Sequence, residues 1–313
     1  MLNFCTLFDS NFITQGLTMY SSLCEICGGN FHLYIFAFDD ISLSVLRQLN
    51  LKNVTVISLQ EFEDEELLKI KPTRSKGEYC WTCSSSTILY CLEHFNLSHC
   101  TYVDADLYFY SNPQVLVEEM GDKSVLITLH NYAPEYDRTK TSGKYCVQFV
   151  TFRNDAEGLK VLKWWRSVCL DWCYARMEDG KFGDQKYLDD WTERFDCVHV
   201  LKNFGGGIAP WNGTKYFLDE NLQVSYGTQQ YPLCFYHFHD LEFSQGKLNK
   251  THLSWYKISF SYFRLLYIPY IKKLLSVNKK LCQVSDKVVR YHSCEKLRMI
   301  WVFLKSRFLT RLG

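Results

Sequence analysis

Four short apolar runs, separated by stretches with helical spacing, dominate the first third of the chain. The apolar runs are Leu2–Phe8, Phe31–Phe38, Val54–Leu59 and His99–Val103. Apolar residues at intervals of three and four predict helices between these runs. The predicted helices are Asn11–Cys27, Ser42–Leu49, Glu61–Ile70 and Thr82–Phe95. Ser10 or Asn11 is expected to cap the first of them. Strands that alternate with helices of this length predict βαβ units. We therefore expect an α/β fold around a mixed, mainly parallel sheet.

The remainder of the chain is less regular but continues the same pattern. The further predicted elements are the strands Val125–Leu129, Cys146–Phe152, Cys197–Leu201 and Leu233–Phe238, and the helix Leu159–Cys173. A length of 313 residues is enough for a substantial core in one or two domains.

Charge divides the chain into two parts, although the formal net charge is only +1. Residues 251–313 contain thirteen Lys or Arg residues and two acids, whereas residues 1–250 contain 22 basic and 32 acidic residues. The near-neutral total argues against a nucleic-acid binder. The division predicts an acidic body over residues 1–250 and a basic, apolar, helical tail over residues 251–313.

The apolar run Ile258–Ile271 in this tail is too short to span a membrane. Apolar stretches beside cations suit contact with an anionic membrane surface, which we expect for residues 254–313. The alternative is a helical extension that packs on the body or in an oligomer.

Cysteine usage and the first residues indicate the compartment. No positively charged segment precedes an apolar core at the start, so we expect no signal peptide, reduced thiols and a cytoplasmic location, peripheral on the inner face of the membrane. Cys24 and Cys27, and Cys80 and Cys83, form two CxxC pairs more than 50 residues apart, unlike the tighter spacing of zinc ribbons. Cys24 and Cys27 continue a helical apolar series, which favours core packing.

Asp104 and Asp106 follow a predicted strand directly. Side chains two residues apart project to the same side of a strand. Two adjacent carboxylates repel each other, and a divalent cation relieves that repulsion. Ligands of open α/β sheets bind beyond the carboxyl ends of the strands. The pair therefore predicts a metal site, with a solvated turn as the alternative.

Four motifs in this order resemble the metal-dependent, GT-A type nucleotide-sugar glycosyltransferases, in particular the family 8 glycosyltransferases and their bacterial relatives. The opening from Thr6 to Phe12 is similar to the family's nucleotide-binding turn, and Asp104-Ala105-Asp106 to its metal motif. Asp184-Gln185 resembles the pair beside the donor sugar. His237 resembles the late histidine that completes the metal site. The resemblance covers about residues 1–250 and implies a single Rossmann-like GT-A domain.

This resemblance implies roles for individual residues. Asp104, Asp106 and His237 would hold Mn²⁺ or Mg²⁺, with His239 as the alternative to His237. Asp184 and Gln185 would lie beside the anomeric carbon as the catalytic residues. Contacts with the nucleotide sugar are expected from Thr6, Phe8, Asp9, Asn11, Phe12, Val103, Asp104 and His239. Where the family has Asn-x-Gly, this chain has Cys146-Val147-Gln148.

Two further groups are expected from the residues themselves to bind the donor. Gly206 and Gly207 would let backbone N–H groups approach phosphate, unless they form a plain turn. Arg74, Tyr79 and Thr82 precede or begin a predicted helix and would reach ribose or phosphate, unless they belong to a surface loop.

The expected reaction is transfer of a sugar, with retention at the anomeric carbon, from a nucleotide-diphosphate sugar. A UDP-sugar is the expected donor, and a glycan or lipid-linked molecule the expected acceptor. Two alternatives remain at this stage. One is a phosphohydrolase that uses Asp104 and Asp106 as nucleophile and general acid/base. The other is a non-catalytic glycan- or membrane-binding module, which the 51 aromatic residues would suit.

Overall fold

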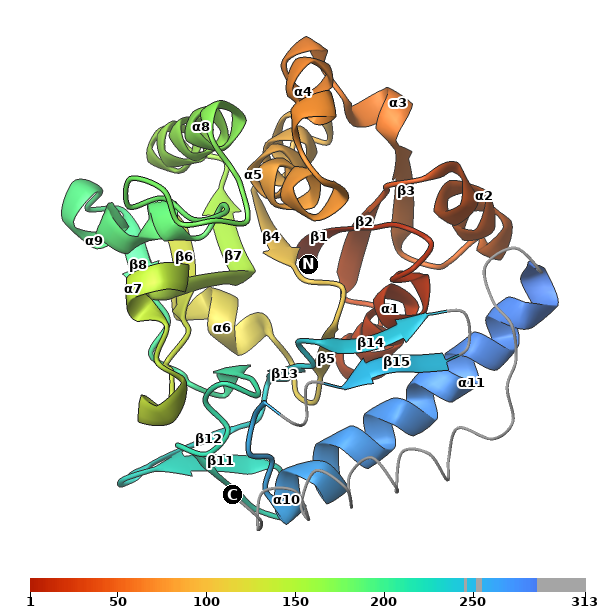
Figure 1. Cartoon of the computed structure of the whole chain (residues 1–313), viewed down its shortest axis with the longest axis vertical. Coiled ribbons are helices and arrows are strands. Elements are labelled where there is room, and N and C mark those ends of the chain that lie inside the picture. The colour runs from red at the N-terminus through yellow and green to blue at the C-terminus, as the bar shows by residue number, and fades with distance from the viewer. Residues whose placement is uncertain (245–246, 252–254, 286–313) are drawn as a thin grey trace.

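The computed structural model describes residues 1–244, 247–251 and 255–285 and has a seven-stranded sheet at its centre (Figure 1). The strand order is β3-β2-β1-β4-β7-β6-β8. The strands are β1 Leu2–Phe8, β2 Phe31–Ala37, β3 Val54–Ser58, β4 His99–Val103, β6 Val125–Leu129, β7 Tyr145–Arg153 and β8 Val198–Val200. Only the two pairings of β7, with β4 and β6, are antiparallel. The α/β class and the mainly parallel sheet are therefore confirmed.

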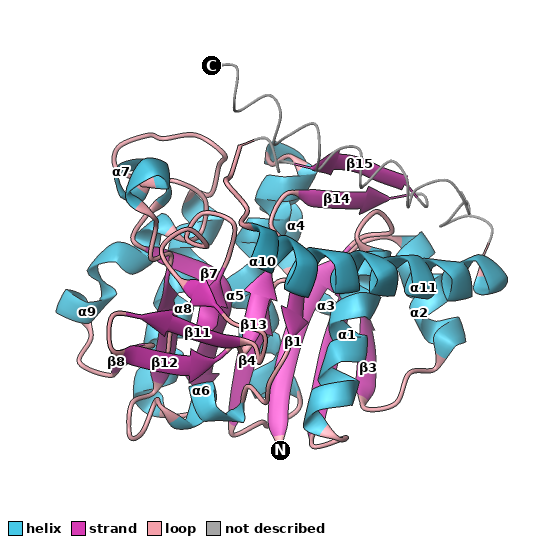
Figure 2. Cartoon of the chain, turned by 90° about the horizontal axis from the view of Figure 1, so that it is seen from below, coloured by secondary structure: helices cyan, strands magenta, loops and turns pink. Residues whose placement is uncertain are grey.

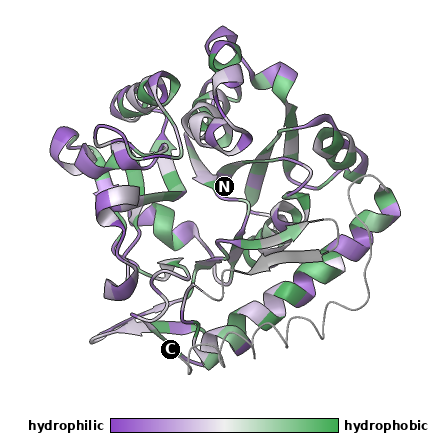
Figure 3. Ribbon diagram, viewed as in Figure 1, coloured by the Kyte–Doolittle hydropathy of each residue, from purple (hydrophilic) through white to green (hydrophobic). Residues whose placement is uncertain are grey.

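Helices cover both faces of this sheet (Figure 3), so its central strands β1, β4 and β7 are buried along almost their whole length. Phe4 and Phe8 of β1 pack in one core, with residues of α1, α2 and α6. Cys5 and Leu7 pack in the second core, with residues of α4, α5 and α8. The longer helices are α1 Ile13–Cys27, α2 Asp40–Leu49, α4 Glu65–Ile70, α5 Lys76–His94, α6 Gln114–Glu118 and α8 Ala156–Asp171. Short helices are α3 Leu59–Phe62, α7 Thr139–Ser142, α9 Trp191–Arg194 and the 3₁₀ turns Lys71–Thr73, Pro134–Tyr136 and Lys186–Asp190.

Several helices begin at other residues than predicted, because capping side chains determine where a helix begins. The predicted helix Glu61–Ile70 is two helices, since Ser58 accepts a hydrogen bond from the N–H of Glu61 and Asp64 accepts one from the N–H of Leu67. The helix predicted from Thr82 begins at Lys76, where Ser75 and Glu78 form a capping box.

The predicted cap of α1 is also wrong. Neither Ser10 nor Asn11 caps the helix, because Ser10 donates to Asp39 and the Asn11 side chain donates to Asp9. Of the two cysteines expected to pack in the core from this helix, Cys27 is buried but Cys24 is exposed, so that expectation is wrong for Cys24.

Three smaller sheets complete the described part of the chain. β5 (Leu107–Phe109), β13 (Phe235–His237) and β9 (Gly206–Ile208) form one, in the order β5-β13-β9. The other two consist of β10 Phe217–Leu218, β11 Gln223–Tyr226 and β12 Gln229–Pro232, and of β14 Leu241–Ser244 and β15 Lys247–Thr251. The predicted division at residue 250 falls inside β15 and stays a prediction.

The start of the predicted tail packs on the body. α10 (Phe260–Tyr262), the π-helical turn Phe263–Tyr267 and α11 (Ile268–Val284) follow one another, and α11 crosses α1 (Figure 2). Tyr270 stacks on Phe238 with ring centroids 3.6 Å apart. The apolar run predicted to face a membrane is therefore largely buried against the body, while residues 286–313 of the tail lie outside the described residues. No helix in the described part of the chain is long and apolar enough to cross a bilayer.

Candidate active site

Asp104, Asp106 and His237 come together beyond the end of β4. β5 begins one residue after Asp106 and pairs antiparallel with β13, which places His237 opposite Leu107. Nε2 of His237 lies 3.1 Å from Oδ1 of Asp106 and 3.9 Å from Oδ2 of Asp104. One ligand atom from each residue lies within 4.8 Å of the others. The structure groups His237 with the two aspartates, whereas His239 pairs with Asp240 at 3.0 Å.

Gln148 of β7 fixes the orientation of His237. Oε1 of Gln148 accepts a 2.7 Å hydrogen bond from Nδ1 of His237. Because an amide oxygen can only accept, the proton of the neutral imidazole lies on Nδ1, and the lone pair of Nε2 faces the aspartates. The backbone oxygen of Gln148 also accepts from the N–H of Asp104 at 3.1 Å. Gln148 therefore contacts both halves of the cluster.

The charges of Asp104, Asp106 and His237 compensate one another. Burial lowers the pKa of His237, but the charges of Asp106 and Asp104 outweigh burial and raise it well above its usual range. Burial raises the pKa of Asp104. For Asp106 the charge and hydrogen bond of His237 outweigh the cost of burial, and its pKa is lowered. The two carboxylates thus need a positive partner, which a protonated imidazole or a cation can supply.

A cavity of about 430 Å³ adjoins this cluster, a size in the usual range for small-molecule sites. Asp104, Asp106, His237 and His239 line it together with Asp184 and Gln185. The structure therefore brings the predicted metal ligands and the predicted catalytic pair to one cavity.

Asp184 is the buried acid of this cavity. It is 5% exposed, and burial, with the charge of Asp104, raises its pKa to about 7 despite a hydrogen bond from Ser84. Its backbone oxygen accepts from Nε1 of Trp165 at 3.0 Å. The neighbouring Gln185 donates from Nε2 to the backbone oxygen of Ser142 at 2.7 Å. The backbone of Asp184 and the side chain of Gln185 are thus held in place by contacts within the protein.

Aromatic rings form much of the remaining wall. The ring of Trp211 meets those of His237 and His239 edge-on, with centroids 5.2 and 5.3 Å apart. Its Nε1 donates to the backbone oxygen of His130 at 2.9 Å. The other aromatic lining residues are Trp81, Tyr102, Tyr132, Phe182 and Tyr256. Arg138 is the one Lys or Arg among the lining residues of this cavity.

The predicted residues of the first turn do not line this cavity. Thr6 and Phe8 are buried in β1. Asp9 accepts two hydrogen bonds from Asn11, both 2.9 Å long, and Phe12 is 40% exposed. Their contacts with the nucleotide stay predictions.

The predicted residues around α5 also lie outside the cavity lining. Arg74 donates to the backbone oxygen of Leu170 and stacks on the ring of Tyr174. The hydroxyl of Tyr79 donates to Glu63 at 2.6 Å, and that of Thr82 donates within the helix. Apart from Nε of Arg74, which has no hydrogen-bond partner in the described structure, these polar groups are engaged within the protein, and their ribose or phosphate contacts stay predictions.

Gly206 and Gly207 lie in β9, next to β13. Neither has a positive φ, so the alternating conformation of a phosphate-binding nest is absent at these two residues. A Cβ on Gly206 would lie 2.5 Å from Leu116, which explains the glycine by packing. Val103 is fully buried at the end of β4. Donor contacts of these three residues stay predictions.

Sequence reasoning missed several residues of the site. Gln148 was visible as a polar residue within an apolar run, but its partner His237 lies 89 residues away. His130 has no ligand spacing, yet it is buried in the cavity wall, and burial lowers its pKa to about 3. The aromatic lining residues carried no signal that separated them from core aromatics.

Comparisons with known proteins give two clear relatives. No family model matches the chain. It is 32% identical over 281 residues to the uncharacterized protein YfnD of Bacillus subtilis (strain 168), which covers 87% of this chain and 88% of YfnD. It is 31% identical over 246 residues to the uncharacterized protein YfnF of the same organism, which covers 75% of this chain and 80% of YfnF.

Solved structures give looser likenesses. One is the galactosyltransferase LgtC in complex with donor and acceptor sugar analogs, at 12% identity and a TM-score of 0.49, covering 88% of this chain and 96% of that one. Another is the glycosyltransferase GlyE of Streptococcus pneumoniae TIGR4, at 15% identity and a TM-score of 0.48, covering 94% of this chain and 65% of that one. With TM-scores below 0.5, these likenesses leave the function to be inferred from the site residues.

Proposed function

The chain belongs to the same family as YfnD and YfnF of Bacillus subtilis, and we propose that it is a metal-dependent nucleotide-sugar glycosyltransferase of the GT-A type. It transfers a sugar from a nucleotide-diphosphate sugar, a UDP-sugar in the first instance, to a glycan or lipid-linked acceptor. One observation carries the proposal: the ligand atoms of Asp104, Asp106 and His237 lie together in the wall of a cavity that also contains the buried acid Asp184.

The three side chains fit a hard divalent cation. Their ligand atoms already lie within 4.8 Å of one another, and Nε2 of His237 is available because Nδ1 is bonded to Gln148. Two carboxylates and one imidazole favour Mn²⁺ over Mg²⁺, which prefers oxygen ligands alone. When bound by these three residues, such an ion would supply positive charge to hold the donor diphosphate and to offset the charge that develops on the leaving nucleotide.

Asp184 and Gln185 contact the donor sugar near its anomeric carbon in this proposal. With a pKa of about 7, Asp184 is present in both protonation states near neutral pH, so its carboxyl group can donate or accept a hydrogen bond with a sugar hydroxyl. Nε2 of Gln185 is bonded to the backbone, which leaves its Oε1 to accept from another hydroxyl. We propose transfer with retention, as the resemblance implies.

The aromatic walls suit sugar rings. A hexose has apolar faces that pack on aromatic rings, while its hydroxyls need polar partners at the edges. Trp81 and Phe182 lie with their ring centroids 6.2 Å apart, next to Gly183 and Asp184 in the cavity wall. We assign this pair to the sugar acceptor, beside the donor sugar at Asp184.

We further propose a cytoplasmic enzyme at the inner face of the membrane. Support comes from the exposed lysines Lys272, Lys279 and Lys280 of α11, which suit an anionic surface. Replacement of all three by Glu is expected to release the protein from anionic liposomes in a sedimentation assay. The control replaces Lys52, Lys69 and Lys140, exposed lysines of other segments, by Glu. Equal release by both triple variants would refute this surface.

The reaction itself is tested with a panel of nucleotide sugars and Mn²⁺. Slow release of free nucleoside diphosphate is expected without any acceptor, because water can replace the acceptor hydroxyl. Asp106→Asn is expected to abolish metal-dependent nucleotide binding, whereas the exposed Asp122→Asn serves as the matched control. Cleavage of a phosphomonoester, with no nucleotide sugar bound or hydrolysed, would support the phosphohydrolase instead.

A further inference from the structure

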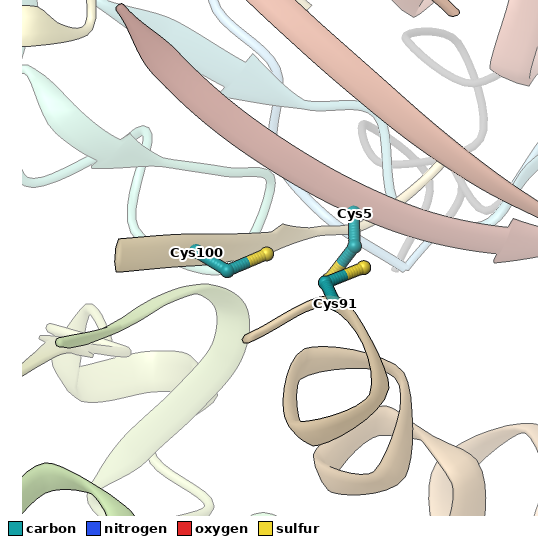
Figure 4. A group of neighbouring side chains, drawn as sticks. All are labelled: Cys5, Cys91 and Cys100. Atoms are coloured by element: carbon teal, nitrogen blue, oxygen red, sulfur yellow. The ribbon is translucent and has the colours of Figure 1, made fainter. Parts of the chain in front are cut away.

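Three cysteines meet in the core between the central sheet and α5 (Figure 4). Cys5 lies on β1, Cys100 on the neighbouring β4 and Cys91 near the end of α5. All three are 0% exposed, and their Sγ atoms all lie within 4.8 Å of one another. Three sulfurs that share one ion at about 2.3 Å lie roughly 4 Å apart. The observed spacing is therefore close to that of a bound site.

The fold brings these thiols together from distant parts of the sequence. In the parallel pairing of β1 with β4, Cys5 lies opposite Tyr102, and Cys100 shares that face of the sheet because side chains alternate along a strand. Thr87, one helical turn before Cys91, places its Oγ1 3.7 Å from Sγ of Cys5. None of the three cysteines lines the cavity of the proposed active site.

Protonation within the cluster is uneven. Burial raises the pKa values of Cys91 and Cys100 well above the usual range of a thiol, so both are neutral. Burial also acts to raise the pKa of Cys5, but hydrogen bonds with Cys100, Cys91 and Thr87 outweigh it and lower the value to about 5. In an apolar core a thiolate ligand needs a cation beside it, which a bound metal ion supplies.

We propose that Cys5, Cys91 and Cys100 form a binding site for a soft monovalent metal ion, with Cu(I) as its natural representative. Thiolate ligands select soft ions. Among the described residues, no fourth His, Cys, Asp or Glu joins this group, whereas structural zinc sites use four ligands. Cu(I) that binds one of these sulfurs as thiolate replaces its proton, which passes to solvent, so the site stays neutral. If the ion also binds a second sulfur as thiolate, that thiol releases one proton to solvent.

A bound ion would join α5 to β1 and β4. An ion that binds the folded chain alone stabilises it by linkage. Because the sulfurs are fully buried, entry requires a local opening of α5 or capture during folding. The activity proposed above does not depend on this site, so the two proposals can fail separately.

The test is an anaerobic titration of the purified protein with Cu(I) against a competing Cu(I) chelator. We expect the wild type to retain one tightly bound equivalent, with ultraviolet thiolate-to-copper absorption. At free Cu(I) one hundredfold above the dissociation constant, the unfolding midpoint should rise by about 5 °C. Cys91→Ser and Cys100→Ser should each lose at least about tenfold in affinity, in keeping with the loss of one ligand.

Cys24→Ser is the matched control, because Cys24 is exposed and belongs to a separate CxxC pair. It should bind Cu(I) as the wild type does. Equal binding by Cys91→Ser, or no retention of Cu(I) by the wild type, would overturn the proposal. Should the buried serine variants fail to fold, X-ray absorption of copper in the wild-type protein decides: three sulfur neighbours support the site, and nitrogen or oxygen neighbours refute it.

Discussion

Gln148 and His237, 89 residues apart in the chain, are joined by a 2.7 Å hydrogen bond from Nδ1 of the imidazole to Oε1 of the amide. The bond directs Nε2 of His237 toward Asp106. Gln148 is itself fully buried, and its Nε2 has no hydrogen-bond partner in the described structure. Gln148 is thus a positioning residue: it would act on a metal ion through the histidine that binds it.

Gln148→Leu should weaken Mn²⁺ binding by about 10- to 100-fold, the usual cost of losing a group that orients a metal ligand. Gln148→Glu keeps an acceptor at the same place and should retain most of the affinity. Isothermal titration with Mn²⁺ and a nucleoside diphosphate measures both. An unchanged affinity in Gln148→Leu, with the fold intact by circular dichroism, would refute the positioning role.

Asp184→Asn should change how stability depends on pH in the metal-free protein. The folded-state pKa of Asp184 is about 7, against a usual value of 3.8, so between these values the folded state holds more protons than the unfolded state. The free energy of unfolding therefore falls as pH rises through this window, by as much as about 4 kcal/mol. Asn does not ionise, so the free energy of unfolding of Asp184→Asn should not fall in this way.

Urea unfolding at pH 5 and pH 8 measures the effect. The variant should be more stable than the wild type at pH 8 and differ much less at pH 5. Asp122→Asn, at an exposed position, should follow the wild type at both values. Equal pH dependence in wild type and Asp184→Asn would show that Asp184 has an ordinary pKa.

Gly206→Ala and Gly207→Ala should separate packing from ligand binding. A Cβ on Gly206 would meet Leu116 at 2.5 Å, and such overpacking costs about 1–3 kcal/mol. On Gly207 the nearest atom is Nε2 of Gln148 at 3.8 Å, so thermal unfolding should barely change. If β9 contacts the donor, Gly207→Ala should raise the KM for the nucleotide sugar. An unchanged KM would remove Gly207 from the donor site.

Tyr270→Ala should destabilise the whole protein. Tyr270 is fully buried and stacks on Phe238, the residue after the proposed ligand His237. Truncation of a buried aromatic residue typically costs about 3–5 kcal/mol. Thermal unfolding should show a large decrease for Tyr270→Ala and almost none for Leu68→Ala, which is 51% exposed. Similar midpoints for both would mean that α11 contributes little to the fold.

Local patterns were sufficient to predict most of the central sheet. β1 and β4 match the predicted ranges Leu2–Phe8 and His99–Val103 in full, because strands buried on both faces are continuous apolar runs. Asp104 and Asp106 follow from the same reasoning, since their spacing alone places them on one side.

Features that depend on distant residues were not predictable in this way. The hydrogen bond of Gln148 and the meeting of Cys5, Cys91 and Cys100 arise from strand order, which periodicity does not determine. The assignment of His237 came from family resemblance. The burial of Ile258–Ile271 was one of two open alternatives, because an apolar stripe beside cations looks the same whether it faces protein or lipid.

The reversed direction of β7 has a consequence for the order of events during synthesis. Through this strand, Gln148 reaches both Asp104 and His237, so the three proposed ligands cannot be assembled on a nascent chain until β13 has left the ribosome. Contacts between residues so far apart in sequence form slowly. The capacity to bind Mn²⁺ should therefore appear late in translation, and its appearance would show that β13 has packed against the earlier strands.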